Sequence, residues 1–208
     1  MNYFKFRKKI EELPLFETRE LRLILGKEFN KSFLNNLKNW ENKEYLIRIR
    51  KGLFLPADLK SAVSPMMLAA KIYAPSYVSM ESALGYYGII PEAVFTTTSI
   101  TARKTVSFTT KDFGKFSYQK IKREAFGGFE THKENNISFN LALPEKALVD
   151  FFYLNRNILD GSKKQFASYR FNEEFKYNKK RLVKFADFFK NKKTAELVNK
   201  FIKYYVAQ

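Results

Sequence analysis

The chain has 208 residues, 45% of them hydrophobic, which is enough for one large domain or for a small domain followed by a medium-sized one. Its 38 lysine and arginine residues against 21 acidic ones give a formal charge of +17, which favours polyanionic partners such as nucleic acid. The absence of cysteine excludes disulfides, thiolate nucleophiles and cysteine-bearing zinc sites. We find no apolar run long enough to span a membrane and no signal-peptide pattern, so we expect a cytoplasmic protein with no membrane partner.

The positive charge is concentrated at the two ends of the chain. Residues 1–60 carry a net charge of +6, residues 61–155 carry +2, and residues 156–208 carry +9. A nearly neutral middle region between two basic ones predicts two separate basic surfaces.

Three short helices are predicted before Trp40. Residues 2–13 place apolar side chains at helical spacing, and a second helix over 19–25 has Thr18 as its N-cap and Gly26 at its end. The third helix runs from about Asn30 to Trp40, and its apolar face is formed by Phe33, Leu37 and Trp40.

A basic hairpin is predicted to follow. In Tyr45–Pro56, isoleucines alternate with Arg48 and Arg50 as in a half-buried strand, and Lys51-Gly52 offers a tight reversal into an apolar strand. Three helices followed by a basic hairpin is the element order of a winged helix-turn-helix. The sequence therefore predicts a winged-helix DNA-binding domain over residues 1–60, with a linker at 57–64.

A second, mixed α and β domain is predicted over residues 61–208. Helices are expected over 66–72, after Ser64-Pro65, and from a Ser79 cap to Tyr87, where Gly88 ends the helix. The predicted strands, which we expect to form an antiparallel sheet, are Val94–Thr98, Val106–Thr110, Phe116–Ile121 and Ile137–Leu141. An apolar helix from Pro144 to Tyr153 precedes a basic helical tail over 156–208, with helices at 178–190 and 195–205. The predicted fold class is α+β.

The third helix is the strongest candidate for reading DNA, because a recognition helix needs an apolar rear face and short polar side chains in front. Lysines on it could meet phosphates, asparagines could pair with adenine in the major groove, and the hairpin could grip the flanking backbone or minor groove. The candidate residues are Lys31, Ser32, Asn35, Asn36, Lys38 and Asn39 on the helix and Arg48, Arg50 and Lys51 on the hairpin. The alternative is an ordinary solvated amphipathic helix and hairpin.

A second basic cluster lies in the tail. Lys179, Lys180, Arg181 and Lys184 would form one surface for a polyanion or a protein partner. The alternative is a helix face that only keeps the chain in solution.

Enzymatic motifs are weak. There is no phosphate-binding glycine loop, and Gly161-Ser162 resembles the opening of a nucleotidyltransferase motif without its metal-binding carboxylates. Ser79 and His132 could form a nucleophile and base pair, but the sequence marks no acid that would orient the histidine. Glu145 and Asp150 are five residues apart on one predicted helix and so point in different directions, which argues against a two-carboxylate metal site. We predict no catalytic residue, no metal site and no cofactor. The alternative reading is a nuclease or RNA-processing enzyme that uses the basic C-terminal surface.

Three blocks of residues resemble a known family, the AbiEi-type antitoxins of bacterial abortive-infection systems. The first is Lys51-Gly52-Leu53-Phe54, and the second joins Tyr77-Val78-Ser79 with Ser82-Ala83-Leu84 and Tyr87-Gly88-Ile89-Ile90. The third is Leu143-Pro144-Glu145-Lys146-Ala147-Leu148-Val149-Asp150, and the resemblance spans about residues 15–155.

The resemblance implies a transcriptional regulator of phage defence. Its winged helix would repress its own operon by binding double-stranded DNA at an inverted repeat in the promoter. The following domain would counter a cognate toxin similar to nucleotidyltransferases, either by direct contact or functionally.

Overall fold

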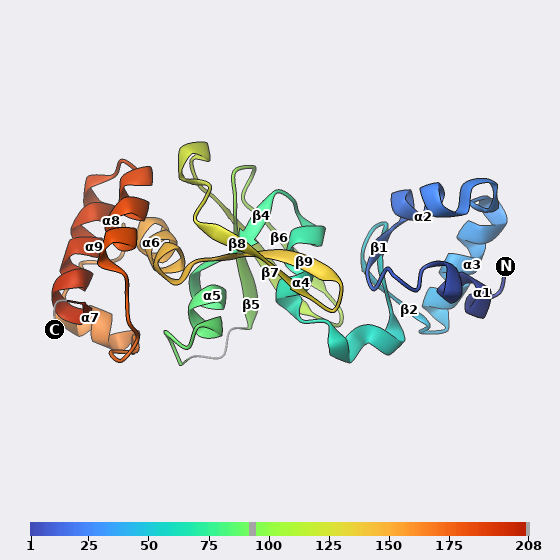
Figure 1. Cartoon of the computed structure of the whole chain (residues 1–208), viewed down its shortest axis with the longest axis horizontal. Helices are drawn as coiled ribbons and strands as arrows, with labels where there is room; N and C mark the ends of the chain where they lie inside the picture. The colour runs from blue at the N-terminus through green and yellow to red at the C-terminus, as the bar shows by residue number, and fades with distance from the viewer. Residues whose placement is uncertain (92–94, 207–208) are drawn as a thin grey trace.

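The computed structural model describes residues 1–91 and 95–206 (Figure 1). The described chain forms three parts in a row: a helical unit with a small sheet at the N-terminal end, a larger sheet in the middle, and a helical unit at the C-terminal end. The α+β class predicted from the sequence is confirmed. None of the helices in these two ranges is both long and apolar enough to cross a membrane.

The N-terminal part has the predicted order of helices and hairpin. Its elements are α1 (Tyr3–Lys9), β1 (Phe16–Glu17), α2 (Thr18–Leu25), α3 (Lys31–Asn42), β2 (Leu46–Arg50) and β3 (Leu53–Pro56). The strands pair antiparallel in the order β1-β3-β2. Aromatic residues fill the core, where the Phe6 ring stacks on Trp40 at 4.9 Å between centroids and lies 5.5 Å from the Phe33 ring. This packing fixes α1 against the rear face of α3.

The start of α2 differs from the prediction. Thr18 is the first helical residue and not the cap, because Glu17 precedes it in an extended conformation. The Glu17 backbone N–H donates to a Glu20 carboxylate oxygen at 2.6 Å, which is the reciprocal half of a capping box. The Thr18 N–H donates to the carbonyl of Gly52 at 2.9 Å, so the beginning of α2 is attached to the tip of the hairpin.

The hairpin belongs to two cores at once. Phe54 packs with the helices of the N-terminal part, whereas Leu53 and Leu55 belong to the large core of the following region, together with Val63 and Met67. The predicted linker at 57–64 contains a short 3-10 helix, Ala57–Ala62. It is held in place, because Lys60 pairs with Asp112 at 2.6 Å and Asn135 Nδ2 donates to the Ala62 carbonyl at 2.7 Å.

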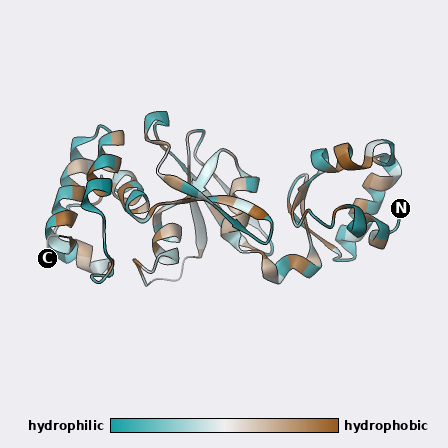
Figure 2. Ribbon diagram, viewed as in Figure 1, coloured by the Kyte–Doolittle hydropathy of each residue, from teal (hydrophilic) through white to brown (hydrophobic). Residues whose placement is uncertain are grey.

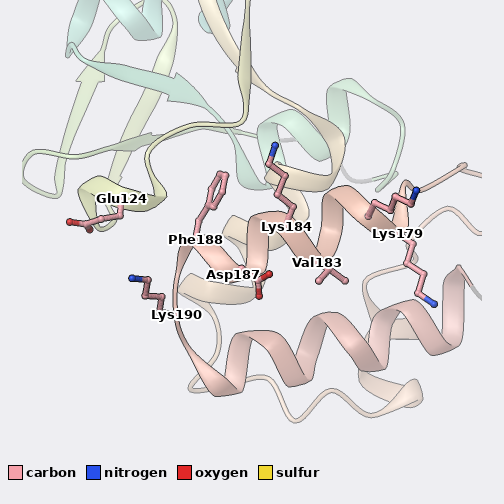
Figure 3. Close-up of a pocket in the computed structure, with 8 residues that line it drawn as sticks. Glu124, Lys179, Val183, Lys184, Asp187, Phe188 and Lys190 are labelled. Atoms are coloured by element: carbon pink, nitrogen blue, oxygen red, sulfur yellow. The ribbon is translucent and has the colours of Figure 1, made fainter.

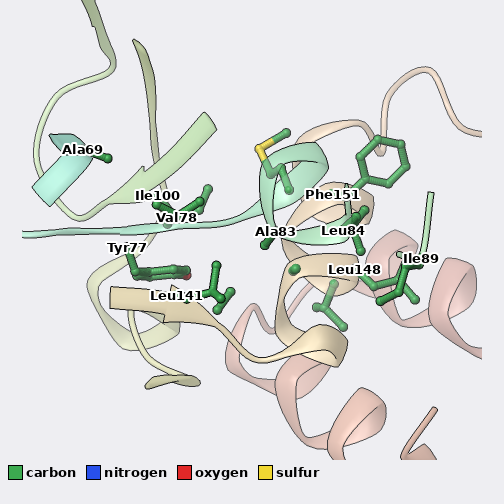
Figure 4. Close-up of a cluster of buried hydrophobic side chains, with 14 of the residues drawn as sticks. Ala69, Tyr77, Val78, Ala83, Leu84, Ile89, Ile100, Leu141, Leu148 and Phe151 are labelled. Carbon is green, nitrogen blue, oxygen red and sulfur yellow. The ribbon is translucent and has the colours of Figure 1, made fainter. Parts of the chain in front are cut away.

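The middle of the chain forms a six-stranded sheet within the described residues, in the order β6-β7-β5-β4-β9-β8. It is covered by α4 (Pro65–Ile72) and α5 (Met80–Tyr86). Its strands are β4 (Ser76–Val78), β5 (Thr96–Thr101), β6 (Val106–Thr110), β7 (Gly114–Lys120), β8 (Phe129–Glu134) and β9 (Ile137–Ala142). Figure 4 shows Val78 and Ile100 together with Tyr77 and Leu141 in the core at the centre of this sheet.

The prediction of an antiparallel sheet is only partly right. The pairs β6-β7, β4-β5 and β8-β9 are antiparallel, but β5-β7 and β4-β9 are parallel. The reason is that β6 folds back onto β7 as a hairpin, which leaves β7 beside β5 and running in the same direction. The predicted strand Val94–Thr98 begins outside the described residues, and β5 starts at Thr96. The strands β4 and β8 were not predicted.

The C-terminal part consists of α6 (Pro144–Leu154), α7 (Lys163–Ser168), α8 (Lys179–Phe188) and α9 (Lys192–Tyr205) among the described residues. Side-chain oxygens of Ser162, Asn178 and Asn191 cap α7, α8 and α9. Phe152 of α6 lies 5.5 Å from the ring of Phe201 of α9, within an extended aromatic core. Figure 2 shows hydrophilic and hydrophobic residues alternating along these helices, as expected for amphipathic helices that cover a core on one side.

Candidate nucleic-acid interface

The position of α3 is fixed by its cap and by its buried face. The Asn30 side chain accepts a hydrogen bond from the Phe33 N–H at 3.0 Å, which defines where the helix begins. Phe33, Leu37 and Trp40 are buried, as predicted. Since these side chains hold the rear face, the opposite face of α3 is presented to solvent in one orientation.

The outward face of α3, hereafter the α3 face, consists of Lys31, Ser32, Asn35, Lys38 and Asn39. All five side chains are exposed. None of them makes a side-chain hydrogen bond or ion pair with any residue that the structure describes. Two ammonium groups, two amides and a hydroxyl are therefore free to contact an external partner.

Asn36 has a different environment from its neighbours on α3. It is half-buried, and its Nδ2 donates to the backbone carbonyl of Met1 at 3.2 Å. The amide thus ties the N-terminus to α3. Of the three asparagines proposed to read bases, Asn35 and Asn39 remain available and Asn36 is already engaged.

The hairpin cations are largely used within the chain. Arg48 pairs with Glu41 of α3 and lies over the ring of Phe54 at 5.5 Å. Arg50 pairs with Glu17 at 2.9 Å and donates to the Lys71 carbonyl of α4 at 3.1 Å. Lys51, at the tip, is exposed and makes no ion pair within the described chain.

These contacts place the hairpin tip against the middle region. Besides the Arg50 bond to α4, the Lys71 ammonium lies 3.4 Å from Glu20 of α2. The Nε of Arg50 is buried without an acceptor, which is the cost of packing a guanidinium into this junction. The structure therefore assigns Arg50 to the junction between the two regions. Arg48 is exposed but paired with Glu41, so Lys51 is left as the exposed hairpin cation without an ion pair in the described chain.

The second predicted surface lies on α8 (Figure 3). Lys179, Lys180 and Lys184 are exposed and make no ion pair within the described residues. Two apolar side chains lie beside them on α8: Val183, which is 39% exposed, and Phe188, which is half-buried. These five residues, hereafter the α8 surface, border an open hollow of about 780 Å³, which is also lined by Glu124, Asp187 and Lys190.

Arg181 does not share this surface in full. Its guanidinium lies 3.8 Å from the buried carboxylate of Glu145 on α6. Glu145 also accepts a hydrogen bond from the Asn178 N–H at 2.9 Å, so it anchors the beginning of α8. Arg181 therefore contributes to the packing of α8 on α6, and three of the four predicted cations are left to meet a partner.

The two basic surfaces lie at opposite ends of the elongated molecule. Figure 1 shows α3 in the N-terminal part and α8 in the C-terminal part, with the larger sheet between them. The two groups of lysines are therefore far apart in the structure as well as in the sequence.

A buried polar network connects β4 with α6 and was not predicted. Lys146 and Asp150 are one helical turn apart, fully buried, and paired with each other. Asp150 Oδ2 accepts hydrogen bonds from the hydroxyls of Tyr77 at 2.9 Å and Ser79 at 2.8 Å, and Lys146 Nζ donates to Tyr77 Oη at 2.8 Å. Tyr77, Ser79, Lys146 and Asp150 are hereafter the Lys146 network.

The Lys146 network explains several residues that the sequence left open. Ser79 occupies the N-cap position of α5, but its hydroxyl donates to Asp150 and does not cap the helix as predicted. Burial raises the pKa of Asp150 and lowers that of Lys146, because the interior disfavours both charged forms, while the attraction between the two groups opposes both shifts. All four of these side chains are shielded from solvent. The network is a structural feature.

The remaining candidates for chemistry are not assembled into a site. His132 packs its ring on Phe139 at 5.7 Å, and the hydroxyl of Ser79 is occupied by Asp150. Residues 1–91 and 95–206 contain no group of histidine and acidic side chains suited to a metal ion. No protein-family model and no curated protein matches the chain, so its function is inferred from the geometry of its surfaces.

Proposed function

We propose that residues 1–60 are a winged helix that binds double-stranded DNA, with α3 in the major groove. The observation that carries this proposal is the α3 face: five exposed polar or basic side chains without partners among the described residues, on a helix whose rear face is held by aromatic packing. Lysines at the two ends of that face suit phosphates, and the amides between and beside them suit base edges.

The hairpin contributes less to this proposed interface than the sequence suggested. Of the three hairpin cations, Lys51 alone is exposed and makes no ion pair with the part of the chain that the structure describes, while Arg48 and Arg50 hold the hairpin to α3 and α4. Contacts to the DNA backbone from the wing would therefore come from its tip.

The resemblance to AbiEi-type antitoxins extends this proposal to a biological role. We propose a transcriptional autorepressor that binds an inverted repeat in its own promoter and acts as the antitoxin of a nucleotidyltransferase-like toxin. The region after the winged helix would supply protection from the toxin. Within that region the α8 surface, whose lysines make no ion pair with the described residues, is best suited to a partner of negative charge.

The alternative function, a nuclease or RNA-processing enzyme, has no observation in its favour. The buried carboxylate of Asp150 is already paired with Lys146.

Asn35 and Asn39 are expected to read sequence. Changing either one to Ala should cost about 1–3 kcal/mol of binding free energy at one base pair of each half-site, because a bidentate contact to adenine is lost, while binding to unrelated DNA is unchanged. The measurement is a gel shift against the promoter and against a set of single-base operator variants.

Asn36→Ala is the matched control for this experiment. Its amide bonds to the Met1 carbonyl, so its loss should leave the order of preference among operator variants unchanged. If Asn35→Ala and Asn39→Ala weaken all DNA sequences equally, these residues contact the backbone and the proposed reading of bases is wrong.

The α8 surface is expected to be needed for protection from the toxin. Reversing Lys179, Lys180 and Lys184 to Glu should abolish protection in cells that express the toxin, because the surface would then repel an anionic partner. Circular dichroism should show an unchanged fold, since all three side chains are exposed and unpaired within the described chain.

The matched control reverses three other exposed lysines, Lys163, Lys164 and Lys192, which lie on α7 and α9. This variant has the same net charge as the α8 variant but an intact α8 surface. Equal loss of protection in both would show that total charge matters and that the α8 surface is not a specific site. Full protection by the α8 variant would make the surface an ordinary solvated face.

A further inference from the structure

A hollow of about 530 Å³ lies where the larger sheet meets the C-terminal helices. Its walls come from α5, β5, α6 and the segment that follows α7, including Leu84 and Phe151, which Figure 4 shows near each other. This volume is in the range of small-molecule sites, which are commonly found where two structural units meet. None of its lining residues belongs to the α3 face or the α8 surface.

Three aromatic rings form a corner of this hollow. The ring of Phe151 is nearly perpendicular to those of Tyr169 and Phe171, at 81° to each, with centroids 5.1 Å and 6.2 Å away. Tyr169 and Phe171 are inclined to each other by only 30°. Phe151 and Phe171 are almost fully buried, so the core holds these rings in place. Aromatic faces carry partial negative charge and attract cations.

Glu81 contributes the one charged side chain among the described residues that line the hollow. It forms no ion pair with any residue that the structure describes. Burial raises the pKa of Glu81, and a hydrogen bond from its own backbone N–H opposes this shift. A half-buried carboxylate without a counter-charge is a costly arrangement that a bound cation would relieve.

We propose that this hollow binds a small organic cation with an apolar body, such as an arylalkyl ammonium ion. The ammonium group would pair with Glu81, and the apolar body would pack against the corner formed by Phe151, Tyr169 and Phe171. An anionic ligand would be repelled by Glu81, and a neutral apolar one would cover the carboxylate without pairing it. Because the walls come from both the sheet and the C-terminal helices, the ligand would also strengthen the junction between them.

The test uses the full chain and two probes of matched shape, 2-phenylethylammonium and the neutral 2-phenylethanol. Saturation-transfer NMR and calorimetric titration should show the cation binding at least about tenfold more tightly than the alcohol, because only the cation can pair with the carboxylate. Glu81→Gln should reduce cation binding to the level of the alcohol. Glu196→Gln, which removes an exposed carboxylate on α9, should leave both affinities unchanged.

A second variant, Tyr169→Leu, keeps the test decisive if Glu81→Gln does not fold. It removes one ring against which the apolar body packs, so it should weaken the binding of the cation and of the alcohol alike. Equal affinity of the two probes, failure of the cation to bind at millimolar concentrations, or cation binding that is unchanged in both Glu81→Gln and Tyr169→Leu would each overturn the proposal.

Discussion

Replacing Lys146 with Met is expected to lower the free energy of unfolding by about 3–5 kcal/mol, because it leaves the buried carboxylate of Asp150 without its counter-charge. Asp150 would keep only the hydroxyls of Tyr77 and Ser79 as hydrogen-bond donors. The measurement is urea unfolding followed by circular dichroism, which gives the midpoint and the slope for the variant and the original chain.

The double variant Lys146→Met with Asp150→Leu is the control for this prediction. It removes both charges and replaces them with apolar groups of similar size, so it should be clearly more stable than Lys146→Met alone. The comparison separates the cost of an unpaired charge from the cost of lost packing. If the double variant were as unstable as the sum of both single variants, the two side chains would act independently and the Lys146 network would not be a coupled unit.

This network also gives a physical account of the resemblance blocks. Tyr77 and Ser79 lie on one side of the β4 segment, and Lys146 and Asp150 are one turn apart on α6, so two of the blocks meet at the same buried point. A signal was present in the sequence: two opposite charges four residues apart in a strongly apolar helix. Asp150 and Glu145 do not share a face of this helix, whereas Asp150 and Lys146 do, and this second pairing was not predicted.

Local patterns predicted the N-terminal part well because its elements are specified locally. The buried stripe of Phe33, Leu37 and Trp40 and the Asn30 cap define α3 from neighbouring residues alone. The error at Thr18 has the same origin, since Glu17, whose backbone N–H donates to the Glu20 carboxylate, takes the cap position, and glutamate is a less common cap than threonine.

The larger sheet was harder to predict because its pairings connect distant segments. The strand β4 has only three residues, and β8 is an edge strand whose side chains are mostly exposed, so neither shows an alternating pattern. The parallel pairing of β4 with β9 joins segments some sixty residues apart, Val78 and Leu141, and no turn motif marks it. Sequence periodicity identifies strands but not their neighbours.

The same limit applies to the hairpin cations. Alternation of Ile and Arg correctly predicted β2, but it gave no indication that Arg50 would meet the Lys71 carbonyl and Glu17. A basic side chain in a hairpin has the same sequence pattern whether its partner is a phosphate or a carboxylate of its own chain. Only the tertiary contacts distinguish Lys51, which is free of ion pairs within the described chain, from Arg50.

The double variant Lys31→Glu with Lys38→Glu is expected to abolish repression while leaving protection from the toxin intact. Two phosphate contacts would be lost for each bound chain, so the slope of log affinity against log salt should fall by about two units per chain on the operator. Without these contacts fewer counterions are released when the protein binds, which by itself should weaken promoter binding roughly 10-fold at moderate salt. Repulsion between the new carboxylates and the phosphates should weaken binding further. Filter binding at several salt concentrations measures both quantities.

The two halves of the proposed function should then separate in one pair of full-length variants. The α3 variant should not repress but should protect, whereas the Lys179, Lys180 and Lys184 reversal should repress but not protect. Full-length chains are preferable to a fragment of residues 61–208, because deleting the hairpin would remove Leu53 and Leu55 from the core they share with Val63 and Met67.

Arg50→Ala is the control for the salt slope. The guanidinium of Arg50 is engaged with Glu17 and α4, so it should make no phosphate contact, and its loss should leave the slope unchanged. If the α3 variant lost protection as well, with an unchanged circular dichroism spectrum, protection would depend on DNA binding, and the two surfaces would serve one function.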